Sequence, residues 1–380
     1  MAVLKSDSGS SNAGSSLSSG SAGLELAAPR MGLRLSDLRF LLVLLLPLLT
    51  LLGVLGDPSY SALGTAMVYL LVVAFDALVP AARKSPSPVA TSGYFSALLR
   101  LYVPTQFLLQ ICAGWVAWHS SWPVALGLAL SVGFVAGAQG ITLAHELGHS
   151  RSRTDRFLGW ALMASVGYAH FMVEHYRGHH PRAATFGDPA SARLGESLWR
   201  FLPRTLSGSL RSAWRLESAQ LKQLHRSWLR SPLAWSFIFQ FTLIFSVVAL
   251  GPKLLVFWLV QAAFAVWLLE TVNYIEHYGL QRSVQGGRHE PFGPLHAWNA
   301  DHLVSNSLLI NLQRHSDHHM HPSTPYASLT RIEPALQLPT GYAGCLALAA
   351  IPPLWFAIME RRLCAGPVGE TSGRCEAIHY

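Results

Sequence analysis

Charged side chains are scarce in this sequence: Asp, Glu, Lys and Arg make up only 13% of its 380 residues, whereas 51% are hydrophobic. In ordinary soluble domains about a quarter of all residues are charged. The composition therefore argues against a soluble domain and favours a chain embedded in a bilayer. The formal net charge is +8. The basic residues nevertheless fall between apolar runs and form no patch interleaved with aromatic residues, so we expect no nucleic-acid binding.

Cysteine is equally rare. The four cysteines show neither a CxxC pair nor the density of a disulfide framework, which argues against a zinc ribbon and a secreted scaffold. They are Cys112, Cys345, Cys364 and Cys375. A built-in rubredoxin or ferredoxin module would need four closely arranged cysteines to hold its iron. Any electrons for redox chemistry must therefore come from another protein.

Large apolar side chains are few in residues 1–30, which are rich in Ser and Gly. Such a segment cannot bury enough apolar surface to offset the entropy cost of ordering it, so we expect a disordered tail. It contains no apolar core typical of a secretory signal peptide. The rest of the chain is expected to form one membrane domain over residues 31–358 and a C-terminal tail over residues 359–380.

Long apolar runs follow one another from Phe40 onward, and several approach the ~20 residues that a helix needs to cross the hydrocarbon core. The sequence therefore predicts an all-α membrane protein with six transmembrane helices, at about residues 40–56, 63–80, 99–118, 124–145, 233–250 and 254–276. A further apolar stretch, residues 341–358, is interrupted by Pro352 and Pro353, which break a helix interior. We expect a kinked or interfacial segment there, with a complete seventh crossing as the alternative.

The basic residues predict the orientation of the bundle, because Lys and Arg near helix ends tend to stay cytoplasmic. The short turns at residues 57–62, 119–123 and 251–253 carry only Lys253, whereas the opposite ends of the helices carry many arginines. We therefore expect a multi-pass protein of the inner or plasma membrane. Both termini, the 150–232 segment and the active site should lie on the cytoplasmic side.

Histidine is abundant, with 17 residues, and about half of them fall in boxes near the expected cytoplasmic boundary. The first box, HELGH, holds His145 and His149, which share a helix face at i, i+4 spacing and can reach one metal ion. In the second box, EHYRGHH, His175 and His179 repeat this spacing. His180 lies about 100° around the helix and is better placed to serve a second ion.

The third box, LQRHSDHH, places His315, His318 and His319 on one helix face, and His277 in NYIEHYG ends the sixth span. Ionisable residues at membrane depth are costly and therefore indicate function. Eight or nine imidazoles exceed what one ion would take, so the pattern predicts two ions. Imidazole suits iron, copper, zinc and nickel alike, but zinc cannot cycle electrons, so a redox-active pair for oxygen chemistry is favoured.

Two other functions fit parts of this pattern. HELGH matches the HExxH signature of zinc metalloproteases, but a catalytic zinc uses three protein ligands and leaves the second and third boxes unexplained. A metal transporter could also place histidines at helix ends. Its polar residues would be expected to continue across the bilayer, whereas here they gather at one boundary.

The boxes HELGH, EHYRGHH, NYIEHYGL and LQRHSDHHMHP, in this order, resemble the alkane 1-monooxygenase (alkane omega-hydroxylase) family, as do TFGDPASARLGES, AWNADHLVSN and LPTGY. The resemblance covers roughly residues 36–358. It implies six membrane helices, a cytoplasmic helical cap carrying a di-iron site, and rubredoxin with its reductase as electron donors. The implied reaction is terminal hydroxylation of an alkane with dioxygen. A membrane fatty-acyl desaturase or hydroxylase, which uses similar boxes, is the nearest alternative.

By this resemblance nine histidines match the iron ligands, although the sequence does not divide them between the two irons. They are His145, His149, His175, His179, His180, His277, His315, His318 and His319. Ligating histidines usually donate their second ring nitrogen to a carboxylate or carbonyl. Four carboxylates next to a box histidine are candidates for this role: Glu146, Glu174, Glu276 and Asp317. Adjacent helix residues do not face each other, so each should serve a histidine of another box, unless these are ordinary boundary carboxylates.

The substrate channel is expected to involve the first span. Some relatives carry a bulky Trp there that restricts chain length, whereas this sequence reads PLLTLLGVLGD and has no aromatic residue. Leu51, Leu52 and Val54 are therefore the candidate channel residues. We expect medium- to long-chain alkanes as substrates, held so that the chain end reaches the site first.

Overall fold

The computed structural model of the chain describes residues 33–79 and 93–365, so the tail expected at residues 1–30 lies outside the described residues. Within them, six helical segments are long and apolar enough to cross a membrane. They are η1 (Leu35–Leu44) with α1 (Leu45–Leu55), η2 (Pro58–Tyr60) with α2 (Ser61–Leu78), α3 (Gly93–His119), α4 (Trp122–Val135) with η3 (Ala136–Gly140) and α5 (Ile141–His149), α10 (Pro232–Leu250), and α11 (Pro252–His277). The structure confirms the six expected crossings and a multi-pass membrane protein.

The ends of these segments follow from local sequence. Pro232 and Pro252 stand at the first position of α10 and α11, where a missing N–H is tolerated and the fixed φ suits the helix. The hydroxyl of Ser231 accepts a hydrogen bond of 3.3 Å from the N–H of Ala234 and caps α10. Between the two helices Gly251 adopts a φ of +131°, which favours glycine. The two spans are therefore joined by a tight hairpin.

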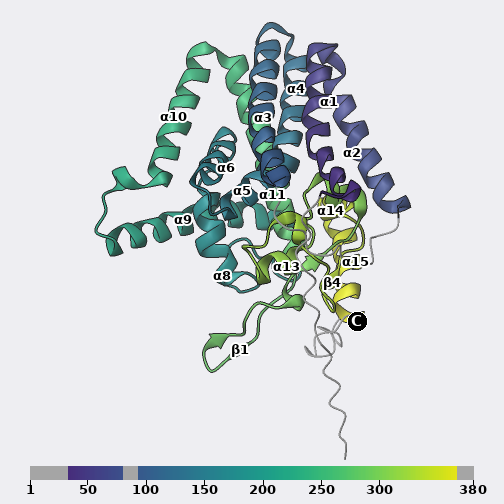
Figure 1. Cartoon of the computed structure of the whole chain (residues 1–380), viewed down its shortest axis with the longest axis vertical. Helices are drawn as coiled ribbons and strands as arrows, with labels where there is room; N and C mark the ends of the chain where they lie inside the picture. Colours follow the sequence, from purple (N-terminus) through teal and green to yellow (C-terminus); the bar gives the residue numbers. More distant parts are fainter. Residues whose placement is uncertain (1–32, 80–92, 366–380) are drawn as a thin grey trace, which may run out of the picture.

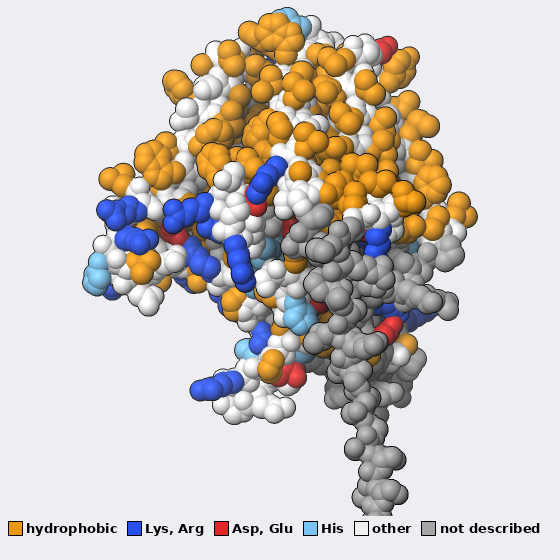
Figure 2. Space-filling model, in the orientation of Figure 1, with side chains coloured by type: hydrophobic (Ala, Val, Ile, Leu, Met, Phe, Trp, Pro, Cys, Tyr) orange, Lys and Arg blue, Asp and Glu red, His pale blue; other side chains and the backbone are white. Residues whose placement is uncertain are grey.

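The spanning segments form one bundle, and most of the other described residues lie at one end of it (Figure 1). We call residues 150–231 and 278–365 the cap. Hydrophobic side chains cover the bundle, and Lys and Arg side chains gather below the edge of this apolar surface (Figure 2). This distribution is expected when the bundle lies in hydrocarbon and the cap lies in water.

Segments α4 and η3 approach α11 closely because they present glycine to it. A Cβ atom added at Gly133 would stand 2.7 Å from the carbonyl oxygen of Gln261, and one at Gly137 would stand 2.8 Å from the Cα atom of Ala265. Small residues of this kind let helix backbones approach each other in lipid. The contact holds the helix that carries HELGH against the helix that ends in His277.

The cap is built from short elements. In chain order they are α6 (Arg153–Ser165), α7 (Phe171–Glu174), η4 (His175–His179), α8 (His180–Arg182), α9 (Leu198–Gln223), η5 (Trp228–Arg230), β1 (Val284–Gln285), β2 (Arg288–His289), η6 (Pro294–His296), β3 (Trp298–Asn299), α12 (Leu303–Leu308), α13 (His315–Met320), η7 (Tyr326–Ser328), β4 (Leu336–Gln337), α14 (Tyr342–Ala349) and α15 (Pro352–Ala365). The strands form an antiparallel pair, β1 with β2, and a parallel pair, β3 with β4. Apart from these two short ladders the fold is helical, as expected.

The apolar stretch at residues 341–358 does not form one continuous helix. Helix α14 ends at Ala349 and α15 begins at Pro352, and neither is among the six segments able to cross a membrane within the described residues. The expected break at the two prolines is confirmed. Helix α15 continues to Ala365, past the expected start of the C-terminal tail, and residues 366–380 lie outside the described residues.

Candidate metal centre

Nine histidine side chains meet where α5 and α11 reach the cap. They fall into two clusters, in each of which one ligand atom per residue lies within 4.8 Å of all the others. The five-histidine cluster contains His145, His149, His175, His180 and His318, and the four-histidine cluster contains His179, His277, His315 and His319. Seven of the nine side chains are buried. These are the nine residues expected from the sequence, and the structure adds their division into two groups.

HELGH lies at the end of α5, with the Nε2 atoms of His145 and His149 only 3.3 Å apart. Gly148 leaves room for the ring of Tyr176, whose hydroxyl donates a hydrogen bond of 2.7 Å to the carbonyl oxygen of His145. A side chain at position 148 would collide with this ring. The glycine of the box therefore serves packing, and the expected pairing of its two histidines agrees with the geometry.

The second box forms a π-helical turn, η4, which changes the histidines that share an ion. In such a turn the N–H of residue i+5 bonds to the carbonyl of residue i, and here His180 bonds in this way to His175. The Nε2 atoms of these two residues are 3.0 Å apart, whereas His179 belongs to the four-histidine cluster. The expectation that His179 pairs with His175 and that His180 serves the other ion is wrong, because it assumed α-helical spacing.

The third box divides between the clusters. In α13 the i, i+4 pair of His315 and His319 joins the four-histidine cluster, whereas His318 joins the five-histidine cluster. His277, the last residue of α11, completes the smaller cluster, with its Nε2 atom 3.3 Å from that of His315. Gly279 follows with a φ of +72°, the left-handed conformation that commonly terminates a helix.

The nitrogen spacing fits bound metal ions. Two nitrogens bound to one ion at about 2.1 Å and at right angles lie about 3.0 Å apart, and three pairs of Nε2 atoms within the clusters are 3.0–3.3 Å apart. The Nε2 atoms of His179 and His318 are buried and have no hydrogen-bond partner among the described residues. Leaving such atoms without a partner is costly. A metal ion in each cluster would satisfy them.

Electrostatics favour the imidazole form that metals bind. Burial and, to a lesser extent, neighbouring imidazoles lower the pKa of five cap histidines well below the usual value; these are His175, His180, His315, His318 and His319. A neutral ring has a lone pair for a metal, whereas a protonated ring has none. An all-imidazole donor set suits iron, copper, zinc or nickel.

Asp188, which sequence reasoning missed, is the carboxylate that most closely contacts these rings. Its Oδ2 atom accepts a hydrogen bond of 2.8 Å from Nδ1 of His179, and both side chains are buried. The hydroxyl of Ser191 donates to the same oxygen at 2.6 Å. Burial raises the pKa of Asp188, but the effects of His179 and Ser191 together outweigh it and hold this pKa below its usual value. The available signal was the segment TFGDPASARLGES, which resembles the family but contains no histidine.

Glu276 is the expected carboxylate that lies beside a cluster histidine. Its Oε1 atom is 3.2 Å from Nδ1 of His315, in another box as expected, and accepts a hydrogen bond of 2.8 Å from the hydroxyl of Tyr342. A backbone carbonyl takes the corresponding role at His277, whose Nδ1 donates to the oxygen of His296 at 3.0 Å. Partners of this kind fix the ring orientation of ligating histidines.

The other three expected carboxylates make their hydrogen bonds elsewhere. Glu146 accepts from the backbone N–H of Tyr326 at 3.1 Å, Glu174 pairs with Arg182 at 2.7 Å, and Asp317 accepts from Nδ1 of His321 at 2.8 Å. The first two contacts join α5 to η7 and α7 to α8, and Asp317 also accepts a hydrogen bond of 2.6 Å from the N–H of Thr330, which lies beyond α13. They fit the alternative stated for these residues, that of ordinary structural carboxylates.

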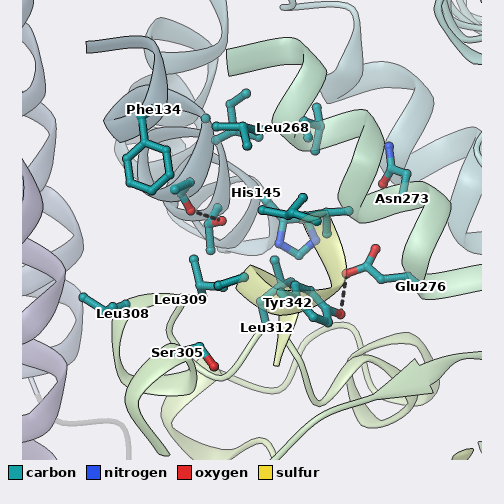
Figure 3. A pocket seen from close by; sticks show the side chains of 18 of the residues that line it. Phe134, His145, Leu268, Asn273, Glu276, Ser305, Leu308, Leu309, Leu312 and Tyr342 are labelled. Atoms are coloured by element: carbon teal, nitrogen blue, oxygen red, sulfur yellow. Dashed lines mark hydrogen bonds between the residues drawn. The ribbon is translucent and has the colours of Figure 1, made fainter. Parts of the chain in front are cut away.

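A pocket inside the bundle reaches the clusters from the hydrocarbon side (Figure 3). Its lining consists mainly of hydrocarbon side chains and includes His145 and His175 of one cluster and His315 of the other. Among the described residues that line it there is no Lys or Arg. Figure 3 also shows the hydrogen bond between Glu276 and Tyr342, both of which line the pocket. The pocket is suited to a molecule without charge.

The expected channel residues lie in α1 but do not line this pocket, whereas Leu46 does. Leu52 is 66% exposed on the outside of the bundle, Val54 is buried, and Leu51 is partly buried in the apolar contacts of α1. Their influence on chain length stays a prediction.

Comparison with known proteins identifies the family. Residues 120–347, more than half of the chain, match the family model described as fatty acid desaturase. An alkane 1-monooxygenase 2 from Pseudomonas aeruginosa is 40% identical over 320 residues, which cover 80% of this chain and 84% of that protein. The chain belongs to the alkane 1-monooxygenase family.

Alkane 1-monooxygenases from other bacteria agree with this assignment. One from Pseudomonas putida is 40% identical over 293 residues, covering 73% of this chain and 71% of the relative. One from Acinetobacter baylyi is 35% identical over 313 residues, covering 79% and 76%. Membership in the alkane 1-monooxygenase family confirms the resemblance seen in the histidine boxes and makes the chain an enzyme.

Proposed function

We propose that the protein hydroxylates the terminal carbon of medium- to long-chain n-alkanes, using dioxygen and two electrons that rubredoxin brings from its reductase. One observation carries this proposal: two adjacent histidine clusters border a pocket lined mainly by hydrocarbon side chains. The names of the relatives, which describe alkane 1-monooxygenases, support the same reaction. The product would be a primary alcohol.

Two non-haem irons are the proposed cofactor. The five-histidine cluster would hold one and the four-histidine cluster the other, with the neighbours His318 and His319 binding different ions. Imidazole suits iron, so the donor set fits. Iron would supply the redox changes and the dioxygen activation that zinc cannot supply.

The protein's own residues would position the substrate by shape. A terminal methyl group offers neither charge nor a hydrogen-bonding group, so only the apolar walls can bring it to the part of the pocket that His145, His175 and His315 line. Holding the reacting carbon there replaces a random encounter with a fixed approach. Asp188 would meanwhile hold the ring of His179 through its hydrogen bond, and Glu276 would place a carboxylate beside the ring of His315.

A fatty-acyl desaturase is the second candidate, because residues 120–347 match the fatty acid desaturase family model. A fatty acid carries a carboxylate that needs a cationic or hydrogen-bonding partner when buried. The described lining of the pocket offers no Lys or Arg as a cationic partner and includes the carboxyl group of Glu276, which when ionised would repel a carboxylate; this favours an alkane, although Thr142 and Asn273 could donate hydrogen bonds. The reaction product separates the two candidates, since hydroxylation gives an alcohol and desaturation gives an alkene.

Substrate length would be set by the space beyond Phe134. This residue borders the main pocket and two further cavities, one beside α1 that includes Leu46 and one beside α14 that includes Tyr69. The rings of Phe134 and Tyr69 meet edge to face with centroids 6.2 Å apart. A long alkane would therefore pass Phe134 into one of these cavities.

Tryptophan substitutions in α1 test the length of the channel. Leu46→Trp should shorten the longest alkane accepted, because it fills the lining itself. Val54→Trp, Leu51→Trp and Leu52→Trp should have smaller effects. The effect should fall from the buried Val54 through the partly buried Leu51 to the exposed Leu52. The measurement is the product profile over a series of n-alkanes; an unchanged profile for Leu46→Trp would contradict the proposed route.

The function itself is tested with purified protein in lipid, supplied with iron, rubredoxin, rubredoxin reductase and NADH. An n-alkane series is offered and the products are identified by gas chromatography, with His318→Ala as the inactive control. Primary alcohols are expected. Alkenes would support the desaturase instead, and full activity in an iron-free preparation would contradict the cofactor.

We also propose that both termini and the active site face the cytoplasm of a cell whose inner or plasma membrane holds the bundle. The gathering of Lys and Arg on the cap side supports this orientation (Figure 2). A green fluorescent protein fused to the C-terminus should fluoresce, whereas an alkaline phosphatase fused there should be inactive. The opposite pair of results would reverse the orientation.

A further inference from the structure

A groove lined by five arginines lies on the cap between α9 and the segment that follows α8. The arginines are Arg182, Arg193, Arg204, Arg211 and Arg215. Two of them are neutralised, since Arg182 pairs with Glu174 at 2.7 Å and Arg204 pairs with Glu196 at 2.6 Å. The other three form no ion pair with any described residue. We call this surface the arginine groove.

The groove is positive because its lining offers little to balance these charges. Arg193, Arg211 and Arg215 are exposed, and Asp188 is the carboxylate in the lining. Asp188 is buried and already bonded to His179 and Ser191. The three free guanidinium groups therefore face solvent, where they can attract an anionic surface.

Helix α9 carries its charged and apolar side chains on different faces. Trp199, Leu210 and Trp214 are exposed, and each is followed directly by an arginine, namely Arg200, Arg211 and Arg215. Successive residues of a helix lie about 100° apart, so an arginine stripe runs beside the apolar stripe.

The position of α9 determines whether each of its stripes faces the bilayer or water. The helix runs along the base of the bundle, beside the end of α10 (Figure 1). An amphipathic helix at this level places its Trp and Leu side chains against the bilayer and its basic side chains toward water. The arginine groove is therefore open to a soluble partner.

The floor of the groove is connected to the metal centre. Asp188 lines the groove and bonds to Nδ1 of His179, so one hydrogen bond of 2.8 Å separates it from the four-histidine cluster. A protein bound over the groove would thus stand at the end of a short bonded path to that cluster. The exposed hairpin formed by β1 and β2 carries Arg288 and His289 away from the groove and serves as a separate basic surface for comparison.

We propose that the arginine groove is the docking surface for the acidic face of the electron-donor protein, which rests on the proposed function. Carboxylates of the donor would pair with Arg193, Arg211 and Arg215 and place its redox centre over Asp188. Each encounter would oxidise the donor by one electron and reduce the metal centre by one, without making or breaking a bond. Two encounters supply the two electrons of the proposed reaction.

The test uses the double charge reversal Arg211→Glu/Arg215→Glu in the full-length, iron-loaded protein in phosphatidylcholine nanodiscs. The KM for reduced rubredoxin should rise at least about tenfold and lose most of its dependence on salt, because charges on an interface act mainly on the encounter. At saturating rubredoxin kcat should be nearly unchanged. Binding of redox-inactive zinc-substituted rubredoxin, measured by biolayer interferometry, should weaken by a similar factor.

Three controls make the test specific. Arg211→Lys/Arg215→Lys should behave like the wild type, because it keeps the charge. Arg288→Glu, on the hairpin, and Arg361→Glu, on α15, change the charge of the cap elsewhere and should leave the KM for rubredoxin within about twofold. An equal loss in these variants would show a general charge effect and overturn the proposal.

Two other outcomes also overturn it. One is an unchanged KM and Kd in the double variant. The other is an effect that appears only in phosphatidylglycerol nanodiscs, which would assign the groove to lipid headgroups. Failure of the proposed function is recognised separately: the wild-type protein, reduced with dithionite and exposed to oxygen, would then form no alcohol, whereas the binding measurement would still decide the role of the groove.

Discussion

The two histidine clusters differ in what lies behind their rings. In the four-histidine cluster, His179 is bonded to Asp188, and Glu276 stands 3.2 Å from His315. In the five-histidine cluster no ring has a carboxylate within salt-bridge distance in the part of the chain that the structure describes. One site thus combines fewer imidazoles with nearby negative charge, and the other relies on an additional neutral donor.

This difference teaches that two ions in these sites would not be equivalent. A carboxylate bonded to the outer nitrogen makes an imidazole a more basic ligand, so the four-histidine site should favour the more highly charged state of its ion. The arginine groove adjoins this same site through Asp188. The four-histidine site would therefore receive electrons first, whereas the five-histidine site has the larger number of imidazoles.

The largest effect should come from removing a ligand, and the neighbours His318 and His319 allow the comparison within one helix. His318→Ala should empty the five-histidine site and His319→Ala the four-histidine site, and each variant should lose activity because both ions are needed. Iron analysis should show a loss of about half of the bound metal in either case. Equal retention of metal in both variants, with the proteins still inserted in the membrane, would refute the division.

A smaller effect is expected from Asp188→Asn, which keeps the shape of the side chain but removes its charge. The apparent metal affinity of the four-histidine site should fall about 10- to 100-fold, measured by competition with a chelator. Ser191→Ala is the graded control and should act more weakly, because Asp188 still bonds to His179 and to the N–H of Ala190. An equal loss of affinity at both sites would remove the proposed asymmetry.

The smallest expected effect distinguishes Glu276 from Glu174, which the sequence analysis named together as candidate partners of ligating histidines. Glu276→Gln should lower activity by up to about tenfold, because Glu276 stands beside His315. Glu174→Gln should leave metal content and activity close to the wild type, since Glu174 pairs with the partly exposed Arg182. Metal loss in the Glu174 variant comparable with that in the Glu276 variant would contradict the positions assigned to them.

The membrane spans could be predicted from the sequence because composition and length alone determine them. The first span starts at Leu35, earlier than expected, because the charge of Arg39 concealed its beginning. In the structure the Arg39 side chain donates a hydrogen bond of 3.0 Å to Asn311 of the cap. A distant partner of this kind is invisible in a local window of sequence.

The grouping of the histidines could be predicted where they lie in a regular α-helix, and could not be predicted where the helix is irregular. His145 and His149 obey α-helical spacing, whereas the π turn at His175 to His180 shifts the register by one residue. Asp188 lies in an irregular segment, where no periodicity indicates the direction of a side chain. Its contact with His179 depends on the path of the chain through the cap, which only the structure gives.

Anomalous diffraction at the iron absorption edge, on crystals of the iron-loaded protein, would test the central claim most directly. We predict two iron peaks per chain, one surrounded by His145, His149, His175, His180 and His318 and the other by His179, His277, His315 and His319. A single peak, or two peaks enclosed by any other grouping of these histidines, would contradict the account.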